Sequence, residues 1–89
     1  MTTSAPTVLI VDDEAKSRDR LACLLAPGGY DTTSAASGEE ALSSVACEAP
    51  DLILIAQTMP GIDGCQVASI LKADPATENI PIIMVTCVE

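Results

Sequence analysis

The chain has 89 residues and a mass of 9.1 kDa, the size of one small domain with a thin core. Thirteen Asp and Glu residues against four Lys and Arg residues give a formal charge of -9. This charge argues against nucleic acid or an anionic membrane as the main partner, because both need a basic patch. Tyr30 is the single aromatic residue, so we expect an aliphatic core. No apolar run approaches the roughly 20 residues of a membrane span, and no signal peptide is recognisable.

Elements of the first half alternate between strand and helix. Residues 8–11 are β-branched and continuously apolar, which predicts a strand buried on both faces. Residues 15–26 have helical spacing and end at Pro27, with Leu21, Leu24 and Leu25 as the expected buried stripe. Residues 30–36 predict a short, less apolar strand near a sheet edge.

The second half continues the alternation. Ser37 and Glu40 form a capping-box pattern that opens a second helix, which runs to about residue 48. Residues 51–56 predict a second apolar strand, followed by a turn at residues 59–61. Asp63 and Gln66 can cap a third helix to about residue 73, with Val67, Ile70 and Leu71 on its apolar side. Residues 81–86 predict a last strand, which is strongly apolar.

The cysteines bear on the redox state of the chain. Cys23, Cys47, Cys65 and Cys87 are widely spread, without a Cys-x-x-Cys pair, and the chain has no histidine, so we expect no zinc site. Three of the four lie in apolar helical or strand patterns, where a free cysteine acts as a small hydrophobic residue. We therefore expect reduced thiols and a cytoplasmic location.

The predicted order of elements, β-α-β-α-β-α-β, implies a parallel sheet with helices on both faces. Ligands of such sheets bind at the carboxyl ends of the strands. The residues to inspect are therefore Asp12 and Asp13, residues 56–60, and Thr86. Two adjacent carboxylates suit Mg²⁺, which takes one or two carboxylates and keeps several waters. Equally, residues 12–14 could simply cap the following helix.

Four segments in the right order resemble the response-regulator receiver family: residues 8–14, 50–55, 59–64 and 80–86. The resemblance covers nearly the whole chain from Thr7 onward. It implies a flavodoxin-like (CheY-like) doubly wound parallel sheet with strand order 2-1-3-4. Residues 1–6 would then be a flexible N-terminal tail and residues 7–89 a truncated receiver domain.

The resemblance also implies a site. In the family, an aspartate ending the third strand accepts a phosphoryl group from a histidine kinase. Carried over by position, Asp12, Asp13 and the backbone carbonyl of Thr58 would hold Mg²⁺. The hydroxyl of Thr86 would contact the phosphoryl group, and Pro60 and Gly61 would form the loop after the acceptor.

Two departures from the family pattern change the expected chemistry. The acceptor position is Ala56, which has no nucleophile and no ligand oxygen. Gln57 is also unusual, and one engineered substitution would explain Ala56 but not Gln57, which favours a natural degenerate receiver. The second departure is length. The chain stops before the family's last third and its lysine, and Lys72, expected in the middle of a helix, cannot replace that lysine.

Three interpretations follow. The first is a receiver domain in phosphorelay (two-component) signal transduction, not an enzyme, that is not phosphorylatable at the usual position and acts by protein–protein contact. The second is a fragment or inactive mutant of a normal phospho-accepting response regulator, and the third is a Mg²⁺-dependent phosphoryl-transfer enzyme. In the first, the partner is a histidine kinase or another signalling protein, and Mg²⁺ binding is weak because one carboxylate is missing. The apolar edge strand at residues 81–86 further implies that the chain either is a fragment of a longer protein or pairs through this edge with itself or with a partner.

Overall fold

The computed structural model describes residues 5–85. Four parallel strands form one sheet in the order β2-β1-β3-β4. The strands are β1 (Thr7–Val11), β2 (Asp31–Ala35), β3 (Leu52–Ala56) and β4 (Ile82–Val85), and the helices are α1 (Ala15–Leu25), α2 (Gly38–Cys47) and α3 (Gly64–Lys72). The predicted flavodoxin-like parallel sheet and its strand order are confirmed.

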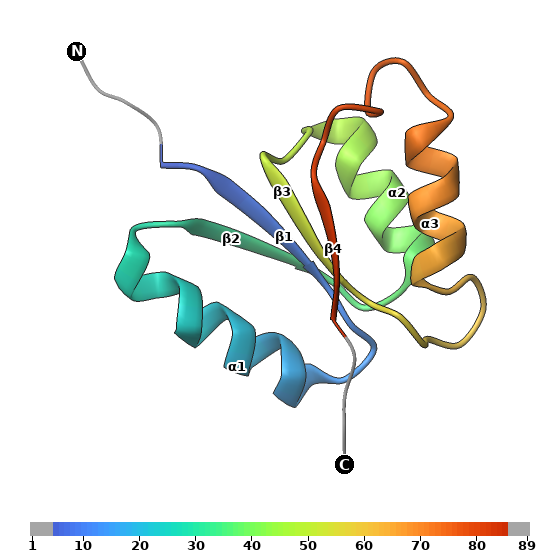
Figure 1. The fold of residues 1–89 in the computed structure, drawn as a ribbon. Coiled ribbons are helices and arrows are strands. Elements are labelled where there is room, and N and C mark those ends of the chain that lie inside the picture. The colour runs from blue at the N-terminus through green and yellow to red at the C-terminus, as the bar shows by residue number, and fades with distance from the viewer. Residues whose placement is uncertain (1–4, 86–89) are drawn as a thin grey trace.

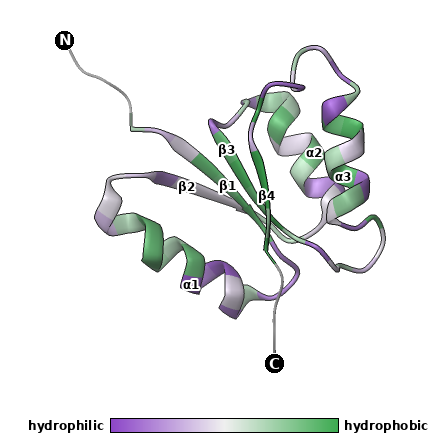
Figure 2. Cartoon of the chain, viewed as in Figure 1, coloured by the Kyte–Doolittle hydropathy of each residue, from purple (hydrophilic) through white to green (hydrophobic). Residues whose placement is uncertain are grey.

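The sheet separates two helical layers: α1 packs on one face, and α2 and α3 pack on the other (Figure 1). The central strands β1 and β3 are apolar along their length, whereas the edge strand β2 is polar (Figure 2). This contrast arises because β1 and β3 are covered on both faces. The larger core cluster lies on the α2–α3 side and includes Leu9, Ile53, Ile55, Val67 and Leu71; a smaller cluster of Val8, Ile10 and Leu54 contacts α1.

Capping residues begin two of the helices where the sequence predicts. Asp63 and Gln66 form a complete capping box at α3, each side chain accepting a backbone N–H of the other residue. At α2, Ser37 accepts the N–H of Glu40, but the Glu40 carboxylate accepts from Ala36 rather than from Ser37. The capping box predicted at α2 is therefore incomplete: the bond to Ser37 forms, but the bond to the Glu40 carboxylate comes from the residue before Ser37.

Two predicted core positions are wrong. Leu24 of α1 is 70% exposed, and Ile70 of α3 is 48% exposed. Within the described residues α1 has no neighbouring helix on its face of the sheet, so the flank that carries Leu24 meets solvent. Leu21 and Leu25, one helical turn apart, do pack against the smaller core cluster.

The cysteines and Lys72 also differ from expectation. Cys23, Cys47 and Cys65 are free thiols, as predicted, but all three are exposed instead of packed in the core. Cys87 lies outside the described residues. Lys72 is the last residue of α3, not a mid-helix residue, and its amine donates to the carbonyls of Glu78 and Ile80.

Candidate functional site

A pocket opens at the carboxyl ends of β1, β3 and β4, where the parallel-sheet rule predicts a binding site. Its volume is about 540 Å³. It is lined by residues from three strand ends and from the start of α1: Asp12, Asp13, Glu14, Ser17, Arg20, Leu21, Ala56, Gln57, Thr58 and Val85. The structure therefore brings Asp12, Asp13, Ala56 and Thr58 together at one pocket.

The acidic loop after β1 is held by local hydrogen bonds. Oδ1 of Asp12 accepts the backbone N–H of Glu14 at 3.0 Å, so one oxygen of this carboxylate already shapes the turn into α1. The Arg18 guanidinium donates to the Asp12 carbonyl. Glu14 is the N-cap of α1 but makes no side-chain capping bond. Of the acidic residues at the start of α1, Asp12 thus has a turn-forming role, while the Asp13 side chain faces the pocket and solvent.

The last residue of β3 forms part of the pocket wall. Ala56 is 9% exposed and presents a methyl group, with no oxygen beyond its backbone carbonyl. Gln57 continues the pairing of β3 with β4 through its N–H, which donates to Val85 at 3.2 Å. The carbonyl of Gln57 in turn accepts the N–H of Gly64, the first residue of α3.

Gly64 allows α3 to begin directly against the end of β3. A Cβ atom at this position would lie 2.5 Å from the carbonyl oxygen of Ala56 and 3.1 Å from the sulfur of Met84. Backbone contact at this distance excludes any side chain, so the close approach requires glycine. This packing holds the start of α3 against the backbone of Ala56 and Gln57, which line the pocket.

The loop between β3 and α3 divides into buried and exposed parts. Met59 is 6% exposed and packs in the larger core cluster, which its predicted place in a turn did not indicate. Thr58 is exposed on the pocket side. Pro60 and Gly61 are exposed and do not line the pocket, and Gly61 has a φ of 80°, which favours glycine.

Sequence reasoning missed the contribution of α1 to the pocket. Ser17, Arg20 and Leu21 line it, and Arg20 and Leu21 follow Ser17 by three and four residues, the spacing of one helix face. Arg20 therefore places a cation at a pocket where the sequence showed none beside the acidic pair. Lys72 does not line the pocket, because it ends α3 at the helix terminus opposite Gly64. Thr86 lies outside the described residues, so its place beside the pocket stays a prediction.

Comparison with known proteins agrees with this architecture. A family model described as the response regulator receiver domain matches residues 8–89. The chain belongs to this family. It is thus a receiver domain of the kind found in two-component response regulators, and such domains are signalling modules.

Individual receivers are similar to most of this chain. The phosphate regulon transcriptional regulatory protein PhoB of Pseudomonas aeruginosa is 42% identical over 80 residues, which are 90% of this chain and 35% of PhoB. The N-terminal domain of a response regulator receiver protein from Methanoculleus marisnigri superposes with a TM-score of 0.84 at 40% identity, over 88% of this chain and 63% of that one. The signal receiver domain of a histidine kinase from Syntrophus aciditrophicus gives 0.89 at 33% identity, over 96% and 64%. The chain thus spans about a third of the length of PhoB and less than two thirds of either solved receiver.

Receiver domains typically bind Mg²⁺ at this edge of the sheet, and the donor set here fits that ion only in part. Asp12, Asp13 and Thr58 line the pocket and would supply two carboxylates and a carbonyl, whereas the Ala56 side chain has no ligand oxygen. Within residues 5–85, no three acidic, cysteine or histidine side chains are arranged to hold a metal ion together. Over the same residues, no helix has the length and apolar character needed to cross a bilayer.

Proposed function

We propose that this receiver domain acts in phosphorelay signalling by protein–protein contact and does not accept a phosphoryl group at position 56. The observation that supports this proposal is the methyl side chain of Ala56 in the pocket beside Asp12 and Asp13. Covalent phosphoryl transfer needs a nucleophilic oxygen at the acceptor, and alanine has none. The acidic pair alone does not replace it.

Without the covalent step, the domain transmits information through the surfaces that it presents to other proteins. In this proposal its partner is a histidine kinase or another signalling protein, and the domain has no enzymatic activity of its own. The net charge of -9 disfavours nucleic acid as a partner, so we do not assign nucleic-acid binding to this domain. In this proposal residues 7–89 are the receiver unit; residues 1–4 of the predicted N-terminal tail lie outside the described residues.

The first test is exposure of the chain to acetyl phosphate with Mg²⁺, followed by intact-mass and peptide mass spectrometry. We expect no phosphoryl adduct, whereas a receiver with an aspartate at this position, treated in parallel, gains one. An adduct would show that another residue accepts the phosphoryl group and would contradict signalling without a covalent step. An aspartate codon at position 56 in the parent gene would instead favour a mutated form of a normal phospho-accepting regulator.

Magnesium binding is a second, separate expectation. Two carboxylates and one carbonyl supply fewer charged ligands than the family's site, and Asp12 already spends one oxygen on Glu14. We therefore expect millimolar or weaker affinity. A Mg²⁺ titration followed by the amide shifts of residues 12–14 and Thr58 measures it.

The matched variant for this titration is Ala56→Asp. A third carboxylate raises the affinity for Mg²⁺ and, by like-charge repulsion, lowers the stability of the metal-free form by about 1 kcal/mol or more. Urea unfolding with and without Mg²⁺ measures both effects. Tight, saturable binding by the unaltered chain would overturn the expectation.

The edge strand β4 supports a further part of the proposal, self-association of the 89-residue chain. Ile83 and Met84 are 51% and 37% exposed, and β4 is the terminal strand of the sheet over the described residues. An exposed apolar edge favours pairing with another strand. We propose that β4 pairs with β4 of a second copy.

A further inference from the structure

A second hollow lies between α2 and α3, toward the C-terminal ends of both helices and away from the pocket at the strand ends. Its volume is about 460 Å³, within the range of about 300–1,000 Å³ of known ligand sites. We call it the α2–α3 groove. It is lined by the C-terminal halves of both helices and by the turn that follows α3: Leu42, Val45, Ala46, Ala49, Ile70, Leu71, Asp74, Ala76 and Thr77.

We infer that the α2–α3 groove binds a basic amphipathic helix of a partner protein. The inference deepens the proposed role in protein contact by naming a surface and the chemistry of its partner. The two can fail separately, because the groove contains no residue of the pocket that holds Asp13 and Ala56. A peptide can therefore bind the groove whatever happens at position 56.

The first argument is the apolar character of the groove. Among the large apolar side chains of α2 and α3, Ile70 is exposed. Leu42, which also lines the groove, is half-buried. The small side chains of Ala46, Ala49 and Ala76 leave room for another element to approach closely. The hydroxyl of Thr77 is already used, since it donates to the carbonyl of Leu71 at 2.6 Å. The groove thus offers apolar surface without an unsatisfied polar floor, as helix-binding grooves do.

The second argument is the sign of the charge around it. Asp74 lines the groove, and the exposed Glu48 and Glu78 are the chain neighbours of lining residues Ala49 and Thr77. Both helices direct their C-termini, the negative ends of their dipoles, toward this end of the layer, and the last turn of α2 carries no basic residue. Each of these features attracts a cation and repels an acidic peptide.

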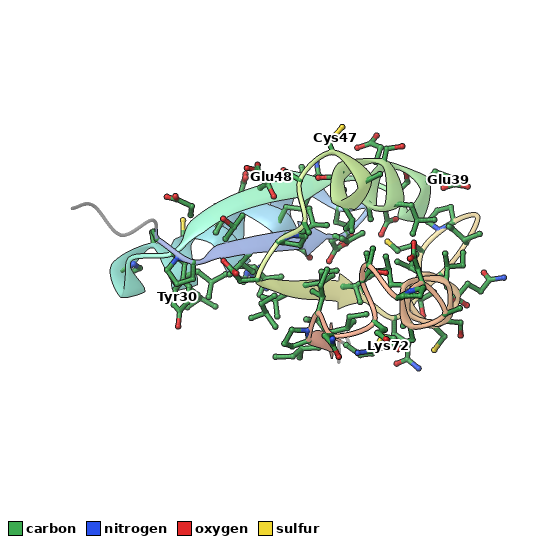
Figure 3. All side chains as sticks on the ribbon, turned by 90° about the horizontal axis from the view of Figure 1, so that it is seen from above. Tyr30, Glu39, Cys47, Glu48 and Lys72 are labelled. Atoms are coloured by element: carbon green, nitrogen blue, oxygen red, sulfur yellow. The ribbon has the colours of Figure 1, made fainter. Side chains whose placement is uncertain are left out.

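The third argument is where the basic residues lie. Lys16, Arg18 and Arg20 are all on α1, which covers the opposite face of the sheet. Lys72 is the one remaining base of the chain, and its amine is bound to two backbone carbonyls of the loop before β4. Figure 3 shows Lys72 on the β4 side of the molecule and Glu48 on the opposite, α2 side. Lys72 neighbours the lining residue Leu71 and lies at Glu78, whereas Glu48 on the other side of the groove is left for a partner to neutralise.

The partner's shape follows from the residues that line the groove. A helix with apolar residues at i, i+3, i+4 and i+7 buries one stripe in such a groove and keeps Lys or Arg on its flanks. Long basic side chains lie along apolar surface with their charged ends in water, where they reach carboxylates at the rim. Apolar anchors and basic flanks together match both properties of this surface.

The test is a titration of the isotopically labelled 89-residue chain with a Leu/Lys peptide that has this spacing, followed by amide shifts. We expect shifts concentrated on the groove residues of α2 and α3. A peptide with glutamate in place of every lysine binds at least about tenfold more weakly, and raising the ionic strength weakens binding of the basic peptide. Shifts concentrated on α1 or at the strand-end pocket would overturn the inference, as would equal binding of the acidic peptide.

Matched variants separate the two arguments. Ile70→Ser removes the exposed apolar anchor and weakens binding at least about tenfold, whereas Leu24→Ser, at the exposed leucine of α1, leaves it unchanged. The pair Glu48→Gln with Asp74→Asn reduces the salt dependence. The pair Asp19→Asn with Asp31→Asn, which changes the net charge equally on the other side of the molecule, does not.

Two outcomes identify a wrong occupant. Concentration-dependent shifts of the groove residues without any peptide would show that a second copy occupies it. Insensitivity of binding to Ile70→Ser, with the amide spectrum of α3 otherwise unchanged, would show that the groove is not the site. Either result rejects the basic helix as its ligand.

Discussion

At the scale of single residues, the contact between Gly64 and the carbonyl of Ala56 decides how the site is built. A Cβ at position 64 would fall 2.5 Å from that oxygen, so α3 can start where it does only with glycine. The same glycine donates its N–H to Gln57. Helix and strand end are therefore locked together directly behind the pocket wall.

Replacing this glycine tests the contact. Gly64→Ala forces the start of α3 away from β3, and overpacking of this kind costs about 1–3 kcal/mol of unfolding free energy. Urea denaturation measures the loss, with Ser69→Ala on an exposed position of the same helix as the control, expected within about 0.5 kcal/mol of the parent. A stabilised Gly64→Ala, as helix propensity alone would give, contradicts the packing argument.

The sequence was informative about the site where strand ends define it. Asp12, Asp13 and Thr58 follow predicted strands, and parallel strands bring their carboxyl ends to one edge, so their gathering could be foreseen. Ser17 and Arg20 could not, because the face that α1 turns to the pocket depends on how the helix docks. The burial of Met59 could not be predicted either, because a turn residue enters the core only when its loop packs against the rest of the fold.

At the scale of elements, the connection from α3 to β4 is held by side chains that bind backbone carbonyls. The Thr77 hydroxyl donates to Leu71 at the end of α3, and Thr77 is 8% exposed. Lys72 donates to Glu78 and Ile80 from the other side. Oδ1 of Asp74 accepts the N–H of Ala76 within the turn. The Thr77 bond thus ties the loop to the end of α3, and the Lys72 and Asp74 bonds hold the loop itself.

Thr77→Val tests this connection with little change in volume. The variant removes one donor from the carbonyl of Leu71, which still accepts the N–H of Asp74 at 3.3 Å, so we expect the cost of one hydrogen bond, about 0.5–1.5 kcal/mol. We expect lower unfolding free energy and faster amide hydrogen exchange over residues 73–80. The same substitution at the exposed Thr33 of β2 serves as the control and is expected to change stability by less than about 0.5 kcal/mol. Equal effects of the two variants would remove the structural role of the hydroxyl.

The helices also show where periodicity alone falls short. The apolar spacing in α1 and α3 identified both helices, and Leu21, Val67 and Leu71 pack as expected. Leu24 and Ile70 share that spacing but are exposed, because an apolar stripe does not say how wide a surface the neighbouring element covers. In the structure, α1 packs only against the sheet, and Ile70 of α3 lies at the groove between α2 and α3, so both exposed residues lie beyond the covered surface.

At the scale of the whole molecule, the edge strand β4 determines how the chain meets other copies. Ile83→Lys places a charge on this edge, a common natural means of preventing strand pairing. We expect sedimentation velocity to show association of the parent chain with rising concentration, and the variant to require about tenfold higher concentration or more. That shift equals about 1.4 kcal/mol.

The control for this experiment is Leu24→Lys, which adds the same charge at the most exposed large apolar side chain, on α1. It is expected to associate like the parent, apart from the smaller effect of reduced net charge. A parent chain that sediments as a compact, cooperatively unfolding monomer at all concentrations would remove the edge-pairing proposal. The groove proposal would be unaffected, because β4 does not line that groove.

The length of α3 sets the distance between the two hollows. Its nine residues rise by about 1.5 Å each, so this rod of roughly 13 Å joins the wall of one pocket to the rim of another. Its first residue touches Ala56, and two of its last turn's side chains, Ile70 and Leu71, shape the far hollow. The strand-end pocket and the α2–α3 groove are therefore attached to the same short helix, although they share no lining residue.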